Sequence, residues 1–141
     1  MSKLADHMKA LKAMDGKNVD VGWFENATYP DGQSVAAVMI ANEFGTKKMV
    51  ARPLMRQSAE VIDKKLPGYI ARRTTEILDG RLSTDNYLEK MGEALVAAVL
   101  STLKEGNFEP NKESTAKRKG FNTPLVETGN LGQSVTHRVS K

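Results

Sequence analysis

The sequence contains no cysteine, and this absence excludes several kinds of chemistry at once. Without a thiol the chain cannot form disulfides, bind metals through thiolates or use cysteine as a nucleophile. Aromatic residues are also scarce, at 6% of the 141 residues, so aliphatic side chains must supply most of the core. No apolar run approaches the ~20 residues that a membrane-spanning helix needs. The remaining composition, 40% hydrophobic and 27% charged, is typical of one globular domain over residues 1–141.

The chain has a net charge of +4, and part of its basic charge lies in three short clusters. These clusters are Lys47-Lys48, Arg72-Arg73 and Lys117-Arg118-Lys119. A mildly basic surface permits contact with the phosphates of DNA. Acidic residues are interspersed, however, which favours a solvated surface of mixed charge. A small nucleic-acid-binding module, with Lys117, Arg118 and Lys119 on the phosphates, is therefore the alternative function.

Residues 1–16 predict an N-terminal helical arm. Leu4, Met8, Leu11 and Met14 recur at helical spacing within residues 3–14, and Gly16 follows at a natural helix end. Lysines interrupt the apolar residues, so the segment does not have the pattern of a signal peptide. A helix this short needs packing to be stable. Two hypotheses have equal weight: the apolar face lies on its own domain, or it docks on a neighbouring subunit.

The next segments alternate between strand, turn and helix signals. Residues 19–24 are β-branched and aromatic and predict a strand, and Tyr29-Pro30-Asp31-Gly32 predicts a turn. Ser34 is placed to cap a helix that continues to about Phe44 and ends at Gly45. The small residues of this helix allow a close approach to a partner surface.

Two longer helices follow. The first begins at Arg52-Pro53 with proline in the first helical position, is broken or kinked at Pro67-Gly68, and stops at Asp79-Gly80. Ser83 or Thr84 caps the second, which ends at Gly106. The apolar stripe of the second helix has spacings of three and four residues. Its members are Leu88, Met91, Leu95, Ala98, Val99 and Leu103.

The C-terminal part combines a long polar segment with a closing strand. Residues 107–124 have few apolar side chains to offset the entropy of ordering, so we expect a long mobile loop that becomes ordered only on assembly. Residues 126–132 predict a capped turn, and residues 134–139 alternate as a strand. The predicted fold is α+β: a small antiparallel sheet packed with several helices, with the long polar loop before the C-terminal strand.

The residues that usually carry catalysis do not form a site. His7 and His137 lie in different predicted elements and have no ligand spacing to other donors. Glu43, Glu127 and Asp31 could form an acid–base set, but each has a simpler role as helix terminus, exposed carboxylate or turn residue. The glycines around Asn130 lack the lysine of a phosphate-binding loop. We therefore predict no catalytic, cofactor-binding or metal residues, and a protein that is not an enzyme.

Two segments together resemble a known protein family. The first is residues 31–46, ending in Asn-Glu-Phe-Gly-Thr, followed by Ala51-Arg52-Pro53-Leu54. The second is Lys119-Gly120 followed by residues 124–135, Pro-Leu-Val-Glu-Thr-Gly-Asn-Leu-Gly-Gln-Ser-Val. In order and spacing they resemble the tail-component proteins of tailed bacteriophages, also called tail-completion, neck or head–tail joining proteins.

The resemblance implies a structural role in the virion. A subunit of this family would be made in the cytoplasm of the host bacterium and form a homo-oligomeric ring at the neck. The ring would be sixfold like the tail, and would link the tail tube or its terminator to the connector or adaptor proteins. DNA would pass through it with weak contact, and no membrane would be involved. Head-to-tail contacts repeated around an axis close such rings.

The motif residues are the candidates for assembly or for loop geometry. They are Glu43, Phe44, Gly45, Arg52, Pro53, Thr128, Gly129 and Leu131. We expect Glu43 and Arg52 to pair and fix the loop between two helices, in preference to contacting a partner. The two glycines serve backbone geometry. Phe44 and Leu131 are predicted in the core, Pro53 starts a helix and Thr128 caps a turn.

Overall fold

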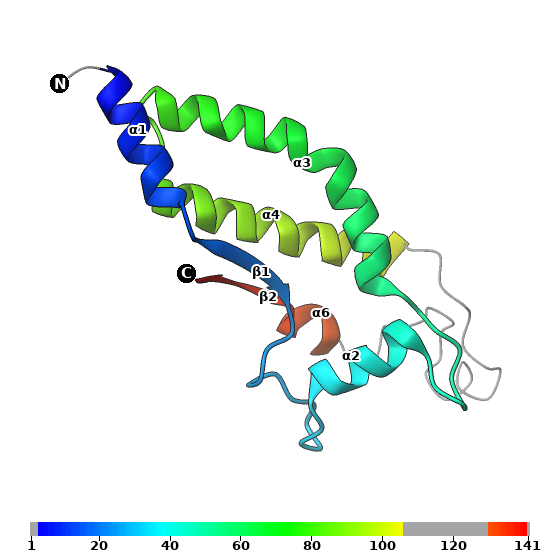
Figure 1. Cartoon of the computed structure of the whole chain (residues 1–141). Helices are drawn as coiled ribbons and strands as arrows, with labels where there is room; N and C mark the ends of the chain where they lie inside the picture. Colours follow the sequence, from blue (N-terminus) through cyan, green and yellow to red (C-terminus); the bar gives the residue numbers. More distant parts are fainter. Residues whose placement is uncertain (1–2, 106–129, 141) are drawn as a thin grey trace.

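The computed structural model describes residues 3–105 and 130–140, and within them the protein has an α+β fold, as predicted. The described part contains five helices and one two-stranded antiparallel sheet (Figure 1). The predicted loop over residues 107–124 lies outside the described residues, as do Lys117, Arg118, Lys119, Glu127, Thr128 and Gly129.

The sheet joins the two ends of the chain. Strand β1 (Asn18–Gly22) pairs with β2 (Thr136–Ser140), so that Asn18 lies opposite Ser140 and Gly22 opposite Thr136. The predicted strands had the right place but different bounds. Trp23 packs against the core beyond the end of β1, and β2 begins only after helix α6 (Asn130–Ser134) has ended.

A short polar contact borders the sheet. The guanidinium of Arg138 on β2 lies 4.1 Å from the centre of the Phe24 ring and 3.1 Å from the carboxylate of Glu25. A hydrogen bond with its own backbone, followed by the contact with Arg138, lowers the pKa of Glu25. The residues that leave β1 are thereby tied back to β2.

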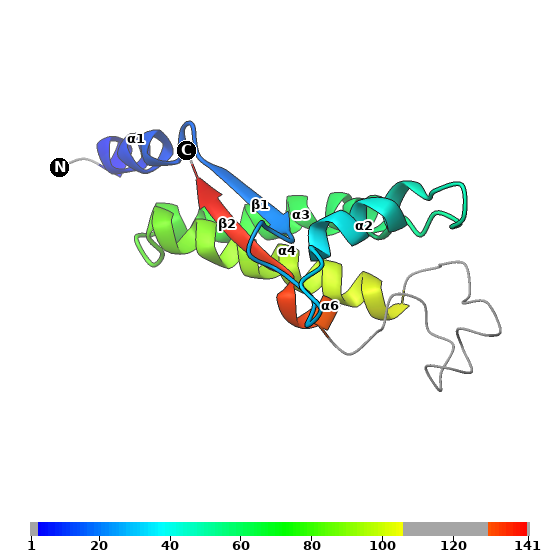
Figure 2. The ribbon, with the colours of Figure 1, turned by 90° about the horizontal axis from the view of Figure 1, so that it is seen from below.

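Helix α4 (Thr84–Glu105) lies at the centre of the molecule, because it contacts both strands and also α3 (Leu54–Leu78). Figures 1 and 2 show α3 and α4 side by side, joined by a short turn. Ser83 caps α4 by accepting a hydrogen bond from the backbone N–H of Asn86 at 3.2 Å. Asp79 and Gly80 end α3, as the sequence predicted.

Two prolines act on α3 in different ways. Pro53 is the N-cap residue, one position before the helix, whereas the sequence predicted it at the first helical position. Pro67 lies inside α3, which continues across it and is bent along its course in Figure 1. Proline removes one hydrogen bond and clashes with the carbonyl four residues earlier, which is enough to bend a helix. The helix is therefore kinked and not broken, and it stays packed on α4.

The core consists of two apolar clusters on either side of the middle of α4. One gathers the start of α3, the end of α4 and helix α2 (Val35–Phe44), and the other gathers the turn between α3 and α4. Their buried members are Val35, Met39, Leu54, Val99, Leu103 and Val135 in the first, and Ile77, Tyr87 and Leu88 in the second. Each fully buried aliphatic side chain contributes about 1.5–3 kcal/mol.

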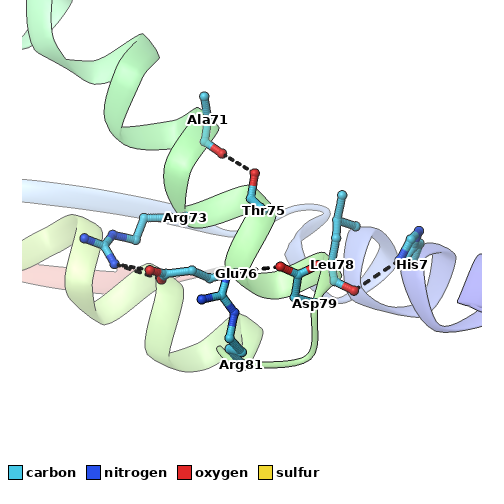
Figure 3. A network of polar contacts seen from close by, with 8 residues as sticks. All are labelled: His7, Ala71, Arg73, Thr75, Glu76, Leu78, Asp79 and Arg81. Carbon is cyan, nitrogen blue, oxygen red and sulfur yellow. Dashed lines mark hydrogen bonds and ion pairs between the residues drawn. The ribbon is translucent and has the colours of Figure 1, made fainter.

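Helix α1 (Lys3–Met14) lies against the second cluster. Ala10 and Met14 pack on that cluster, and His7 Nε2 is 3.2 Å from the carbonyl oxygen of Leu78 (Figure 3). The hydroxyl of Thr84 donates to the carbonyl of Ala10 at 3.5 Å. The hypothesis that α1 lies on its own domain therefore holds for one side of this helix.

Candidate assembly surfaces

The junction between α2 and α3, residues 42–56, contains the end of the first family-like segment, Asn42 to Thr46, together with Ala51-Arg52-Pro53-Leu54. Ser34 begins α2 as predicted, since its Oγ accepts the N–H of Ala37 at 3.3 Å. Gly45 ends α2 with a φ of 75° and donates its N–H to the carbonyl of Ala41 at 2.8 Å. A Cβ at this position would lie 3.0 Å from backbone atoms of Met49 and Ala51. Gly45 therefore serves backbone geometry, as predicted.

Glu43 on α2 caps the N-terminus of α3. Its carboxylate accepts the N–H of Met55 at 2.7 Å and the N–H of Arg56 at 3.1 Å. These N–H groups in the first turn of a helix have no partner within the helix, and Pro53 at the N-cap offers no side-chain hydrogen bond. A carboxylate there also interacts favourably with the helix dipole. The buried Glu43 thus holds two helices together.

The ion pair that the structure shows for Glu43 is with Arg56, whereas the sequence predicted Arg52 as the partner. Arg56 Nε lies 3.1 Å from the Glu43 carboxylate, and its Nη2 donates to the Glu43 carbonyl at 2.5 Å. Arg52 contributes its backbone N–H, which donates to the carbonyl of Asn42 at 2.5 Å. The sequence analysis missed Arg56 because its position in the first turn of α3 depends on how α2 and α3 meet.

Phe44 is 73% exposed, so its prediction as a core residue is wrong. Val35, Met39, Asn42 and Glu43 occupy the buried side of α2. Each residue turns a helix by about 100°, which directs Phe44 away from that side. Ile40, four residues earlier, is 61% exposed, and Ala37 on the same side is exposed too. We call Ala37, Ile40 and Phe44 the α2 surface.

The three residues of the α2 surface are uncharged, and one charged group from α3 borders them. The only charged residue of α2 is Glu43, which is buried, and the guanidinium of Arg56 lies 5.8 Å from the centre of the Phe44 ring. A helix that is apolar all round is normally buried on all sides. The exposed side of α2 therefore has the apolar composition of an interior while it faces solvent. Val50, in the loop that follows, is 62% exposed as well.

A second uncharged surface lies on α1. Leu4, Met8 and Leu11 from the predicted stripe are 68%, 50% and 56% exposed. At 3.6 residues per turn they lie about a quarter turn around the helix from the line of His7, Ala10 and Met14. The contact with the domain therefore uses a histidine, an alanine and one methionine, and leaves the other large side chains outside. We call Leu4, Met8 and Leu11 the α1 surface.

The two surfaces lie at opposite ends of the molecule. Figures 1 and 2 show α1 beside the turn between α3 and α4, and α2 near the other end of α3. Helix α3 has 25 residues and runs between them. A straight helix of that length spans about 37 Å. At this separation the α1 surface and the α2 surface of one copy cannot contact each other.

The basic clusters are divided between ion pairs and exposed positions. Arg73 Nη1 lies 2.7 Å from the carboxylate of Glu76, and this hydrogen bond is the main reason why the pKa of Arg73 is raised. Lys47 and Lys48 are exposed in the loop of the junction. Arg73 is thus paired within its own helix and does not extend a continuous basic face with Lys47 and Lys48.

The remaining sequence candidates have structural roles. His137 Nε2 lies 2.7 Å from the carboxylate of Glu89, and its ring fills the space where Gly92 lacks a side chain. Asp31 accepts the N–H of Gln33 at 3.0 Å and stabilises the predicted turn. Within residues 3–105 and 130–140, no three histidine or acidic side chains are grouped as a metal site. None of the described helices combines the length and the apolar character that a membrane crossing requires.

Comparisons with known proteins give no assignment: no protein-family model, curated protein or solved structure matches this chain. The function must therefore be argued from the junction, the two surfaces and the motif order.

Proposed function

We propose that this protein is a structural subunit of the neck of a tailed bacteriophage. In this proposal, copies of the chain close into a sixfold ring at the head–tail junction. The ring links the tail tube or its terminator to the connector, and DNA passes through it. The order and spacing of the motifs at residues 42–46, 51–54 and 124–135 support this assignment, because they resemble the tail-completion and head–tail joining proteins.

The observation that carries the proposal is the exposed apolar side of α2. Ile40 and Phe44 are among the most exposed large apolar side chains of the described residues, and no charge lies among them on α2. Exposed apolar patches bordered by polar residues mark interaction sites. A subunit that works by assembly requires such a surface, whereas a subunit that works alone gains nothing from it.

The motif residues support the same proposal through the rigidity of the junction. Glu43 makes three bonds to the start of α3, and hydrogen bonds to a charged group contribute about 1.5–3 kcal/mol each. Gly45 allows the tight turn that brings the loop back toward α3. The motif therefore fixes α2 in one orientation, with the α2 surface facing outward before any partner binds. Such preorganisation lowers the entropy cost of association.

Native mass spectrometry of the purified full chain over a range of concentrations tests the proposal. We expect a discrete closed oligomer of six copies, visible as a ring by negative-stain electron microscopy, alone or after addition of isolated tail tubes. A chain that stays monomeric at every concentration, and that does not bind tail tubes or connectors, would contradict the proposal.

A further inference from the structure

We infer that neighbouring copies of this chain are joined by the α1 surface of one copy packed on the α2 surface of the next. The inference rests on the proposed function, since it specifies the contact by which the ring would form. It adds what the motif resemblance does not contain: which residues meet, and that α1 is the partner of α2. The occupant of each surface is a second copy of this chain.

The rotation of α1 about its own axis supports a contact outside the subunit. A helix that served only its own domain would direct its largest apolar side chains toward that domain. Here the domain side carries Ala10 and Met14, whereas Leu4, Met8 and Leu11 point elsewhere and are at least half exposed. These three side chains lie within two turns and form a continuous ridge. The ridge is therefore available for a contact outside the subunit.

The spacing of the side chains on the two surfaces suits packing of one helix on the other. Leu4 and Met8 are four residues apart on α1, and Ile40 and Phe44 are four residues apart on α2. Helices commonly pack by fitting such ridges into the grooves of the partner helix. Ala37 is exposed and has a small side chain, so it leaves a shallow depression beside Ile40 and Phe44. The ridge of Met8 and Leu11 from another copy can fit into that depression.

The exposure of the two surfaces suits the apolar centre of a protein–protein interface. The large side chains are exposed to a similar degree on the two surfaces: 68%, 50% and 56% for Leu4, Met8 and Leu11, and 61% and 73% for Ile40 and Phe44. A standard interface buries about 800 Å² per partner and has an apolar centre with a polar rim. Two or three large apolar side chains from each copy suit that centre, and the residues around them would form the rim.

The position of the surfaces at opposite ends of α3 allows the contact of α1 with α2 to repeat from copy to copy. A contact of α1 with α1 alone would leave the α2 surfaces exposed, and a contact of α2 with α2 alone would leave the α1 surfaces exposed. Pairing α1 with α2 covers both surfaces with one repeated contact. Such a head-to-tail contact generates a ring when its rotation closes. Because the contact consists mainly of apolar side chains, with the guanidinium of Arg56 beside Phe44, we expect it to depend only weakly on salt.

The test uses two full-chain variants, each with a charge in one surface: Met8→Glu on α1 and Ile40→Glu on α2. Both positions are exposed, at 50% and 61%, so we expect neither variant to change the fold. Each variant alone should be monomeric, with association weakened at least about 30-fold, the loss typical of a central interface residue. When the two variants are mixed in equal amounts, Met8→Glu supplies an intact α2 surface and Ile40→Glu supplies an intact α1 surface. The mixture should therefore form a heterodimer and nothing larger.

Matched controls carry the same charge at exposed positions elsewhere. Ala13→Glu lies on α1 outside the α1 surface, and Ala71→Glu lies on the exposed side of α3. Both controls should assemble like the wild-type chain. Thermal unfolding of all four variants checks that the fold is retained. Because the chain has no cysteine, Met8→Cys and Ile40→Cys provide a second measurement: oxidation of their mixture should yield the mixed disulfide in preference to either homodimer.

The possible failures differ from one another. If Met8→Glu and Ile40→Glu both form the wild-type ring, the inference is wrong and the proposed neck function stands. If either variant alone forms a dimer, the chain pairs through like surfaces and the inference is again wrong. If the wild-type chain does not assemble alone or on isolated tails, both the proposed function and this inference fall.

Discussion

The two ends of the molecule present similar apolar surfaces but hold them in different ways. At the α2 end, the buried carboxylate of Glu43 binds two N–H groups and a guanidinium from the start of α3. At the α1 end, the contact consists of Ala10 and Met14 on an apolar cluster and two hydrogen bonds that involve His7 and Thr84. One surface is fixed by charge-assisted bonds, and the other rests on a small apolar contact.

In the proposed assembly, this difference would give the two ends unlike roles. A rigid surface suits a binding site whose geometry must be the same in every copy of the chain. A helix of 12 residues that is marginal by itself suits an arm that adjusts to the neighbour it meets. The comparison predicts that substitutions at the junction reduce the stability of the whole fold, whereas substitutions at α1 have small effects on the monomer. Four substitutions test it, from the largest expected effect to the smallest.

Glu43→Ala should have the largest effect. It leaves two N–H groups at the start of α3 and the guanidinium of Arg56 without their carboxylate partner. We expect a loss of about 3 kcal/mol in the free energy of unfolding, measured by urea denaturation. Glu93→Ala on the exposed side of α4 is the control, and it should change stability by less than about 0.5 kcal/mol. Equal effects of the two substitutions would mean that Glu43 does not hold the junction.

Gly45→Ala should follow, with a loss of about 2 kcal/mol, because the new Cβ meets backbone atoms at 3.0 Å and φ is positive. Gly32→Ala is the matched control. Gly32 also has a positive φ, 89°, but a Cβ at this position would have no other atom within 4 Å. The substitution of Gly32 should lower the free energy of unfolding by only about 1 kcal/mol, which is the cost of placing a residue with a Cβ at positive φ. The difference between the two melting temperatures isolates the tight backbone approach at the junction.

Met14→Ala weakens the contact of α1 with the domain. Met14 is half-buried against the cluster of Ile77, Tyr87 and Leu88. We expect a loss of about 1 kcal/mol, less than for a fully buried methionine. Hydrogen exchange should report faster opening of α1 and no change in α2. If exchange accelerates equally in both helices, the two ends are coupled and the comparison does not hold.

His7→Ala should have the smallest effect, about 0.5 kcal/mol, because it removes one exposed hydrogen bond to the carbonyl of Leu78 (Figure 3). His7→Gln, which can still donate to that carbonyl, should restore part of the loss. Urea denaturation of the three proteins under identical conditions gives the comparison. A loss as large as that of Glu43→Ala would place the stronger attachment at α1 and reverse the assignment of roles.

Local signals in the sequence predicted most of the fold. Helical spacing identified α1 and the stripe of α4, Ser34 and the pair Ser83-Thr84 identified two helix starts, and Gly45 identified one helix end. These signals act within a few residues of the chain, so they can be recognised without tertiary structure. The pairing of the two terminal strands was also expected, because no other strand was available to either of them.

The α1 and α2 surfaces were predicted less well, and the errors have one cause. Helical periodicity shows which residues share a side of a helix, but not which side faces the domain. Phe44 was predicted in the core because large aromatic side chains are more often buried than exposed, but it lies on the exposed side of α2. The stripe of α1 was predicted as Leu4, Met8, Leu11 and Met14, and the side that it faces was left open. The structure divides it, because Met14 packs on the domain whereas the other three are exposed.

The sequence by itself determined the local elements, because caps, turns and side-chain spacing act over a few residues. Only the tertiary structure decided the partners across distance: Arg56 as the ion-pair partner of Glu43, the exposure of Phe44, and the rotation of α1. Glu43 selects the inner side of α2 because its carboxylate is stabilised at the N-terminus of α3, and that choice directs Phe44 outward. Such choices depend on where two helices meet in space, and no short stretch of sequence specifies that meeting point.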